Sequence, residues 1–313
     1  MVEHNGQAMG RIGVMDNRLY NDYRQANTAF FGFFEVFEDD QAAQALFDAA
    51  FEWAHSRGLD EIIGPRGLVG VEGGGALVEG FEYRPAMGIP YNPSYYDGLI
   101  QAAGFEKQSD FLSGYINDQQ DLPEKVGLIA EKVKARYGFH VKSFASIAEL
   151  RSWIPRVAEV HRDAFIHQHA YYPPSQEEID LFAENILSIA DPQLIKLVMK
   201  GDEVAGFIIA YQDISAALQQ IRGKLWPLGW LRLLLERRTT RWVDINGLGL
   251  IPTYQGLGAN AMLYAELRKT LKDYRFEHAE IVQVNEINFL SRSDMENLGV
   301  HWHKRHRHYR RTL

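Results

Sequence analysis

The sequence contains no cysteine, which excludes a thiol nucleophile, a disulfide framework and thiolate metal sites. Acidic residues outnumber basic ones. The formal charge of −8 argues against a general nucleic-acid binder, because affinity for phosphate backbones depends on basic patches. No window reaches the ~20 uninterrupted apolar residues that a membrane span needs. Residues 1–10 lack a basic segment followed by an apolar one, so no secretory signal is expected and the cytoplasm is the predicted compartment.

Length and composition indicate a globular protein with more than one core. A chain of 313 residues is long for a single hydrophobic core, and its 46% apolar and 24% charged residues are typical of a folded protein. A polar, turn-rich stretch at 117–123 separates two patterned halves. We therefore expect two domains, residues 1–120 and residues 121–313.

The first half carries a strand–helix–strand pattern. Residues 10–15 alternate apolar and polar side chains, and residues 30–37 are rich in aromatic side chains, as strands are. Asp39 and Asp40 precede apolar residues at helical spacing, where carboxylates suit the helix dipole. A short strand follows at 61–65, so the order predicts a βαβ-type unit.

Two later features of this half concern turns. The three glycines at 73–75 lack a following Lys-Ser/Thr and do not lead from a strand into a helix. A flexible surface loop is therefore predicted rather than a phosphate loop. Asn92 is expected to cap a helix that Gly104 ends, with a strand after it at 111–116.

The second half has a clearer order of elements. Gly201-Asp202 indicates a hairpin, and Ser175 with Glu178 forms a capping-box pattern. The whole predicts an α/β fold with a mixed α+β sheet. Helices are predicted at 124–137, 148–165, 176–190, 258–271 and 288–298, and strands at 140–144, 194–199, 204–211, 242–251, 279–284 and in the tail.

This order and one glycine-containing segment resemble the GNAT N-acetyltransferase superfamily. The segment Leu248–Gly258 leads from a strand through Pro252 into a helix. The cofactor signature of the superfamily is Gln/Arg-x-x-Gly-x-Gly/Ala. Gln255 and Gly258 fill its first two fixed places, whereas Asn260 stands at the third.

The first half adds a second resemblance. Residues 30–35, 90–96 and 103–105 look like a bacterial group of two-domain GNAT-like proteins, in which a degenerate first domain precedes a cofactor-binding one. This resemblance covers nearly the whole chain. It implies tandem GNAT-like acyltransferase domains, the first degenerate and N-terminally shortened, without its opening strand and helices.

Physical chemistry supports an anion site at the glycine-containing segment. A strand that turns through Gly256 and Gly258 into a helix exposes free N–H groups at the positive end of the helix dipole, and glycine lets phosphate oxygens come close. Residues 251–264 contain no acid. The corresponding turn at 37–41 has three carboxylates and no glycine, so it should reject a pyrophosphate. An ordinary tight turn is the alternative for the second-half segment.

The resemblance implies acetyl-coenzyme A as a cosubstrate. Strand backbone would pair with the pantetheine arm, and the loop, with the Gln255 side chain as a further donor, would hold the pyrophosphate. Asn288 matches the Asn that opens the next helix, but Met295 stands where a proton-donating Tyr is common. The implied cofactor-binding residues are Leu248, Leu250, Ile251, Gln255, Gly256, Leu257, Gly258, Ala259, Asn260 and Asn288.

Transfer to an amine also needs a group that accepts the amine proton. Glu286 and Asp213, each at the end of a predicted strand, are the candidate catalytic residues, with a solvated turn carboxylate as the alternative for Glu286. His167 and His169 could also reach the cleft. No further ligand stands at metal spacing beside these histidines, so no metal site is expected.

Two basic segments allow more than one interpretation. Residues 214–241 combine arginines, tryptophans and leucines, which is typical of an amphipathic helix on a membrane surface or of a pocket lid. We prefer a lid or packing against the protein's own body. The tail 301–311 holds four histidines and five Lys/Arg without an acid. A final edge strand blunted by charge is expected there, with zinc binding as the alternative.

The leading functional hypothesis is transfer of acetyl from acetyl-CoA to an amine of a small molecule or peptide. A ternary complex is implied, because no cysteine can carry the acyl group. The alternative, favoured by Met295 and Asn260, is a GNAT-fold protein that binds CoA or another ligand without catalysis. A third hypothesis is a lipid acyltransferase at a membrane surface. A homodimer is compatible with each of them.

Overall fold

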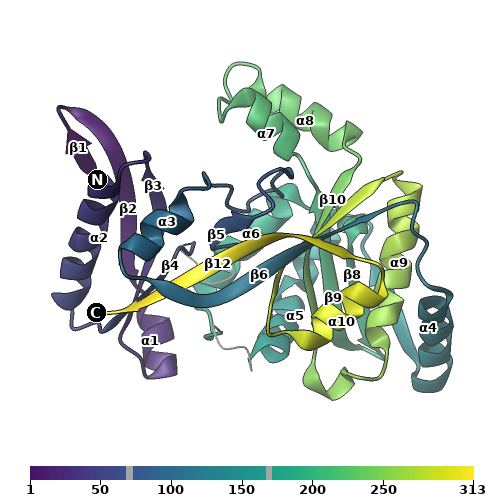
Figure 1. Cartoon of the computed structure of the whole chain (residues 1–313). Helices are drawn as coiled ribbons and strands as arrows, with labels where there is room; N and C mark the ends of the chain where they lie inside the picture. Colours follow the sequence, from purple (N-terminus) through teal and green to yellow (C-terminus); the bar gives the residue numbers. More distant parts are fainter. Residues whose placement is uncertain (68–72, 167–170) are drawn as a thin grey trace.

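The computed structural model describes residues 1–67, 73–166 and 171–313 and shows a large mixed sheet with helices on both faces (Figure 1). In the described chain the sheet has 12 strands, ordered β1-β2-β3-β4-β12-β6-β11-β10-β9-β8-β7, with β5 also paired to β12. The strands are β1 (Val2–His4), β2 (Gln7–Asp16), β3 (Thr28–Val36), β4 (Glu61–Gly64), β5 (Ala76–Glu79), β6 (Glu106–Asn117), β7 (Phe139–Ser143), β8 (Ile195–Lys200), β9 (Glu203–Gln212), β10 (Trp242–Leu250), β11 (His278–Asn285) and β12 (His301–Thr312). The helices are α1 (Arg18–Arg24), α2 (Asp40–His55), α3 (Tyr96–Ala102), α4 (Glu124–Tyr137), α5 (Ile147–Phe165), α6 (Gln176–Ile189), α7 (Ser215–Ile221), α8 (Gly229–Thr239), α9 (Ala259–Asp273) and α10 (Phe289–Asn297).

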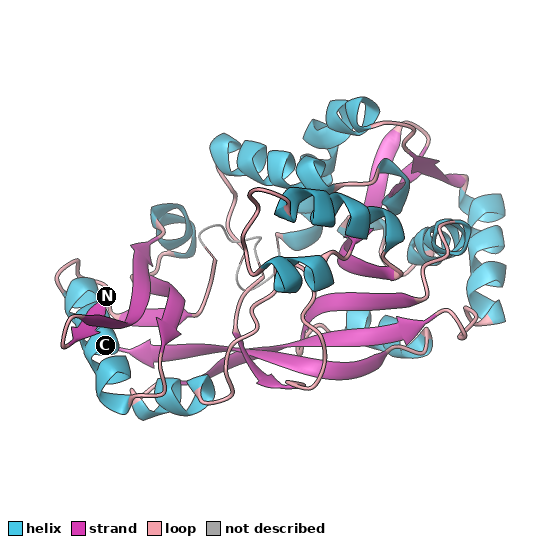
Figure 2. Ribbon diagram, turned by 90° about the horizontal axis from the view of Figure 1, so that it is seen from above, coloured by secondary structure: helices cyan, strands magenta, loops and turns pink. Residues whose placement is uncertain are grey.

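Two long strands join the halves of the molecule. β6, from the first half, pairs antiparallel with β11 of the second half, while β12 lies between β6 and the first-half strands β4 and β5. Figures 1 and 2 show both strands running from one lobe to the other, with the two termini in the same lobe. The prediction of an edge strand at 301–311 is therefore wrong, because both edges of β12 are paired. A domain division near residue 120 stays a prediction.

Each half contains the same strand–helix–strand unit. In the first half, β3 pairs in parallel with β4 over residues 28–30 and 61–63, and α2 connects them. In the second half, β10 pairs in parallel with β11 over residues 242–245 and 278–281, and α9 connects them. The mixed α/β fold predicted from the sequence is confirmed, and these parallel pairs lie within largely antiparallel surroundings.

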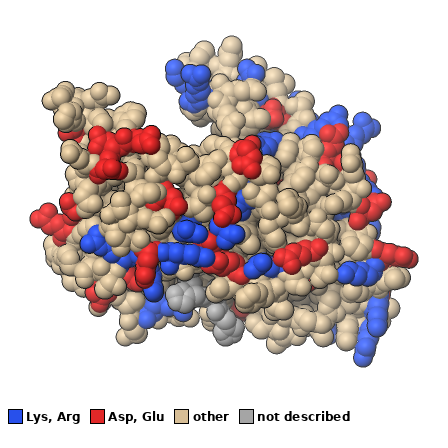
Figure 3. Space-filling model, viewed as in Figure 1, with Lys and Arg blue, Asp and Glu red and all other residues tan. Residues whose placement is uncertain are grey.

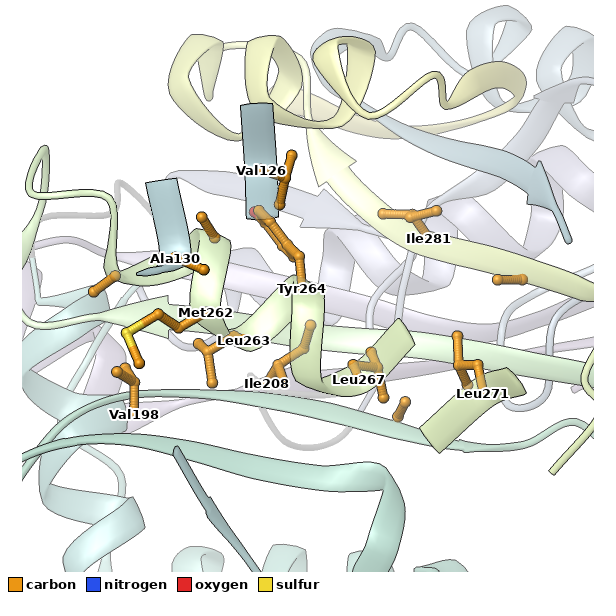
Figure 4. Close-up of a cluster of buried hydrophobic side chains, with 14 of the residues drawn as sticks. Val126, Ala130, Val198, Ile208, Met262, Leu263, Tyr264, Leu267, Leu271 and Ile281 are labelled. Carbon is orange, nitrogen blue, oxygen red and sulfur yellow. The ribbon is translucent and has the colours of Figure 1, made fainter. Parts of the chain in front are cut away.

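Helix α9 lies at the centre of the second-half core. Figure 4 shows it between α4 and the sheet, with Met262, Leu263 and Leu267 directed into this layer. Val198 and Ile208, on neighbouring strands, belong to the same buried cluster. On the opposite face, α5 and α6 contribute to a second apolar cluster with β8 and β9. Helices on both faces therefore fix where β10 and β11 lie.

Some local signals predict structure well, and others do not. The helix at 124–137 begins and ends as predicted, and Ser175 and Glu178 make the reciprocal hydrogen bonds of a capping box. Asn92 does not cap α3. Its side chain instead accepts a hydrogen bond from Leu77 N at 2.6 Å and donates one to Leu77 O at 3.2 Å, as a strand partner would.

The glycines at 73–75 do not form a surface loop. Gly74 and Gly75 are buried, and Gly74 exchanges two hydrogen bonds with the side chain of Gln283 on β11, at 3.1 and 2.7 Å. A Cβ on Gly74 would stand 2.7 Å from His308 Nε2. The surface-loop prediction is wrong, because this run fills a narrow space against the second half.

Residues 214–241 form two helices, α7 and α8, that project from the body in Figure 1. No residue of α8 is buried. Ser215 and Ala217 of α7 are buried, and Arg237 of α8 donates hydrogen bonds to Ala190 and Gln212, so the segment contacts the body as preferred, while the outer face of α8 is exposed.

Candidate functional site

Strands β10 and β11 diverge after four paired residues. Their parallel register ends at Ile245–Ile281, although both strands are described to their ends. Beyond that point, among the residues that the structure describes, β10 remains paired only with β9, and β11 only with β6. The backbones of both strands are irregular where they separate, because Gly247 of β10 and Gln283 of β11 have positive φ angles of 149° and 51°. The edge of β10 that faces β11 is thus free of a strand partner beyond Ile245.

The glycine-containing loop connects this open strand to α9. Gly256 and Gly258 have φ angles of 74° and 84°, in the left-handed region that glycine tolerates best. Gly258 is the N-cap of α9, and as a glycine it has no side chain to accept a hydrogen bond from the first turn of this helix. The Gln255 amide donates to Leu250 O at 2.9 Å, so in this structure it serves the loop itself. Backbone N–H groups at the head of α9 remain available to an anion.

A cavity of about 2190 Å³ joins the loop to the split and to the first half. Its wall includes Gly256 at the loop, Gly247 and Gln283 at the split, and Gly74 and His308 at the junction with the first half. Of the ten residues implied as cofactor contacts, seven line it, whereas Ile251, Leu257 and Ala259 do not. The seven are Leu248, Leu250, Gln255, Gly256, Gly258, Asn260 and Asn288.

Part of the cavity wall is apolar. Helices α5 and α6 and strand β9 contribute large apolar side chains to it, among them Ile154, Val157, Phe165, Phe182, Ile186 and Phe207. The same two helices also contribute charged side chains, among them Glu159, Arg162, Glu178 and Asp180. The apolar side chains favour contact with a hydrocarbon group.

The two candidate bases differ in their access to the cavity. Glu286 lines it, accepts a hydrogen bond from Asp110 N at 3.0 Å and pairs with Lys107 Nζ at 2.8 Å. Asp213 is buried outside the cavity. Its Oδ2 pairs with Arg84 at 2.7 Å, and its Oδ1 accepts a hydrogen bond from Ser215 N at the start of α7. The structure brings Glu286, but not Asp213, to the split.

Helix α10 completes the second-half wall. The Asn288 side chain accepts a hydrogen bond from Ser291 N at 3.2 Å, and Met295 is buried where the resemblance would place a tyrosine. The opposite helix, however, supplies Tyr264, which lines the cavity near Asp294. Burial and the Asp294 charge raise the pKa of Tyr264, so its hydroxyl stays protonated at neutral pH.

Sequence reasoning missed Tyr264 because its position is defined by the approach of two helices. Asn260, at the third place of the loop signature, donates a side-chain hydrogen bond to Asp294 and links α9 to α10. Burial raises the pKa of Asp294, although the Asn260 and Tyr264 side chains oppose this shift. The spacing of Asn260 and Tyr264, one helical turn apart, is the sequence signal that could have suggested a shared face.

Two histidines that were not candidates also line the cavity. Burial lowers the pKa of His161 to about 4 and, with Arg66 and His306 nearby, lowers that of His308 to about 3. Both rings are therefore neutral at neutral pH. His167 and His169 lie outside the described residues. Within those residues no group of three or more His, Asp or Glu is placed to hold a metal ion.

The arrangement is that of the GNAT fold: a strand diverging from its parallel neighbour, a glycine-containing loop and a helix whose N-terminus is open. A crystal structure of a GCN5-related N-acetyltransferase from Sphaerobacter thermophilus matches 98% of this chain and 78% of its own, with a TM-score of 0.54 and 14% identity. A tandem GNAT protein from the clavulanic acid biosynthesis pathway matches 99% and 81%, with a TM-score of 0.56 and 12% identity. The fold of this chain is therefore the GNAT fold in a tandem arrangement.

Relatives by sequence span almost the whole chain. "Protein YghO" of Escherichia coli K12 is 24% identical over 316 residues, covering 98% of this chain and 80% of the relative. "Bacterial ceramide synthase" of Caulobacter vibrioides is 24% identical over 323 residues, covering 100% and 83%. No family model matches the chain. At these identities the comparisons show the fold of the chain, and the relatives by sequence are proteins to which it is similar.

Proposed function

We propose that this protein transfers an acyl group from a coenzyme A thioester to an amine. The observation that carries the proposal is the cavity that connects the open N-terminus of α9 with the split between β10 and β11. Phosphates at the helix head and an extended arm along the free edge of β10 would bring a thioester to the split.

We further propose that the acyl group is a long hydrocarbon chain rather than the acetyl group expected from the sequence. The apolar side chains that α5, α6 and β9 contribute to the cavity wall offer a hydrocarbon chain a surface to pack against, which an acetyl group does not need. The name of the Caulobacter relative points the same way, since a ceramide carries a fatty acyl chain on the amine of a long-chain base. A long-chain amine is accordingly the proposed acceptor class.

The chemical step forms one bond and breaks one. The amine nitrogen attacks the thioester carbonyl carbon, the C–N bond forms, the C–S bond breaks, and CoA leaves as a thiolate. We assign Glu286 as acceptor of the amine proton because it lines the cavity, which Asp213 does not. We assign Tyr264 as donor of a proton to the thiolate, because it lines the cavity beside α10 and its hydroxyl is protonated.

Thiol release tests the activity directly. Because the chain has no cysteine, a thiol-reactive dye reports only the liberated CoA. Acetyl-, octanoyl- and palmitoyl-CoA are each mixed with sphinganine or with a short amine, and amide formation is followed by mass spectrometry. We expect the fastest turnover with palmitoyl-CoA and sphinganine. Turnover restricted to acetyl-CoA would reject the long-chain donor and keep acyl transfer.

The competing function is binding of CoA without catalysis. Two observations favour it: Met295 stands where the resemblance would place a tyrosine, and Glu286 is already paired with Lys107. Calorimetry with CoA separates the two. Binding without turnover for any donor would support this alternative, and absence of binding would reject both functions.

Tyr264→Phe tests the proposed acid. We expect the rate of thiol release to fall by about 100-fold, as general acid catalysis contributes, with CoA affinity unchanged. Tyr274→Phe, just after the end of the same helix, is the control and should keep the full rate. An unchanged rate in Tyr264→Phe would contradict this role.

A further inference from the structure

Helices α7 and α8 and the turn between them form a projection whose surface is unusually apolar. Seven large apolar side chains between residues 225 and 235 are exposed to solvent. Trp226 is 83% exposed and Leu228 is 67% exposed, more than most apolar side chains of the described chain. The seven are Leu225, Trp226, Leu228, Trp230, Leu231, Leu234 and Leu235. We call residues 222–238 the arm.

The exposed side chains of α8 share one face. Trp230, Leu231, Leu234 and Leu235 recur at the three- and four-residue spacing that places them side by side along a helix. All four are exposed. The result is a continuous apolar stripe directed away from the body.

The inner face of α8 is held to the body by specific contacts. Arg237 donates to Ala190 O at 2.7 Å and to Gln212 Oε1 at 3.1 Å. At the other end, Gly229 packs within the arm, so close to Lys224 that a Cβ would stand 2.1 Å from the Lys224 carbonyl oxygen. Arg237 thus ties one end of α8 to the body, and the apolar stripe remains exposed.

Basic side chains flank this stripe. Figure 3 shows Lys and Arg side chains gathered on the projection at the top of the view. Arg222, Lys224, Arg232 and Arg238 are all exposed, and none of them forms an ion pair in the described part of the chain. Glu236 is the one acidic residue of the arm, whereas the whole chain has a net charge of −8. Positive charge is thus concentrated where the apolar side chains are exposed.

We propose that the arm docks on the surface of a membrane that contains anionic lipids. Tryptophan and leucine enter the boundary between headgroups and acyl chains, while lysine and arginine remain with the phosphates. Each cation near an anionic surface strengthens the attraction to it, and the exposed cations of the arm lie where they can do so. No described helix is long and apolar enough to cross a membrane, so the contact is peripheral.

A second copy of the chain fits the arm less well. A symmetric dimer through this face would bring the same unpaired cations of both copies together, and like charges repel. A membrane surface supplies both the hydrocarbon and the opposite charge. The proposal does not depend on acyl transfer, because docking is measured without any thioester.

Flotation of vesicles with the full-length protein tests this proposal. We expect the protein to float with phosphatidylcholine vesicles that contain phosphatidylglycerol, and to stay behind when the vesicles are phosphatidylcholine alone or the salt concentration is high. Absence of flotation with the anionic vesicles would overturn the proposal.

Two matched pairs of variants assign the binding to the arm. Trp226→Ala/Leu228→Ala should weaken vesicle binding by about tenfold or more, because two inserted apolar side chains are lost. Leu128→Ala/Leu181→Ala, which removes comparably exposed leucines on α4 and α6, should leave it unchanged. Arg232→Gln/Arg238→Gln should reduce binding to anionic vesicles, whereas Lys132→Gln/Lys134→Gln on α4 should not.

Thermal unfolding curves confirm that each variant is folded. Equal flotation of Trp226→Ala/Leu228→Ala and the parent protein would contradict the proposal. Self-association that this double variant abolishes, without vesicle binding by the parent, would also overturn it and assign the arm to an interface between copies.

Discussion

The two strand–helix–strand units begin their helices in different ways. In the first unit, the Asp39 carboxylate accepts a hydrogen bond from Ala42 N at 2.9 Å, so the chain places its own anion at the head of α2. In the second unit, Gly258 begins α9 and offers no side chain. One helix N-terminus is therefore satisfied from within, and the other is open to a ligand.

The space beyond each parallel pair differs as well. In the first unit, Arg66 N donates to Phe31 O at 2.8 Å, and a Cβ on Gly32 would stand 2.1 Å from Arg66 O. The chain itself thus fills the gap beside β3. In the second unit, the gap beside β10 belongs to the cavity. The same unit can thus serve as a scaffold or as a binding site, depending on what occupies the helix head and the adjacent gap.

The largest expected effect is on CoA binding when a carboxylate is placed in the open loop. Gly256 has φ 74°, a Cβ added there would meet no heavy atom within 4 Å, and aspartate and asparagine tolerate this backbone region. We expect Gly256→Asp to weaken CoA binding by about 100-fold, because like charges repel. Gly256→Asn has the same shape without the charge and should remain close to the parent. Calorimetry measures both, and equal affinities for the two variants would refute a phosphate site at this loop.

The next effect concerns the seam between the units, where Asp110 of β6 meets Arg305 and Arg307 of β12. Burial alone would raise the pKa of Asp110, but hydrogen bonds from Arg307, Lys107 and Arg305 outweigh it and lower the pKa to about 2. The folded protein therefore binds this proton less readily than the unfolded chain. The resulting stability is complete above about pH 4 and is lost as the pH falls toward 2, a change of about 2 kcal/mol.

Urea unfolding between pH 5 and pH 2 checks this dependence. Asp110→Asn should be less stable than the parent at pH 5, and the difference should shrink as the pH falls. Glu35→Gln removes an exposed ion pair with Arg11 and should change little over the same range. A constant difference between Asp110→Asn and the parent across this range would contradict the assignment.

The smallest expected effect is on stability when the N-terminus of α2 loses its cap. Asp39→Ala should lower the free energy of unfolding by about 1 kcal/mol, the usual cost of losing an N-cap, while Asp39→Asn should retain most of it. Neither change should alter CoA affinity, because the adjacent gap remains filled by Arg66. Urea unfolding and calorimetry measure the two quantities. A second CoA site in Asp39→Ala would show that the cap alone distinguishes the units.

Much of the fold could be predicted because local signals were sufficient. Glycine at the turn of β8–β9, the capping box at Ser175 and the apolar spacing of α4 each act within a few residues. The open loop at Gly256 and Gly258 was likewise visible, since the strand, the turn and the helix are contiguous in sequence.

The rest depended on contacts between distant residues. Asn92 had the right neighbours for a cap but pairs with Leu77. Gly74 is buried and exchanges hydrogen bonds with Gln283, which lies more than 200 residues later. Tyr264 enters the cavity through the approach of α9 and α10, which no spacing within either helix specifies. The exposure of the arm could not be predicted for the same reason. Hydropathy alone does not show whether the leucines on one face of a helix pack against another part of the fold.

The position of β12 between β4 and β6 has a consequence for how the protein is made. This strand is translated after all the other strands, yet it holds β4 and β5 of the first lobe in the sheet. The first lobe therefore cannot complete its sheet until β12 has been made. Nascent chains arrested before residue 301 should be more open to proteases in the first lobe than the full-length chain.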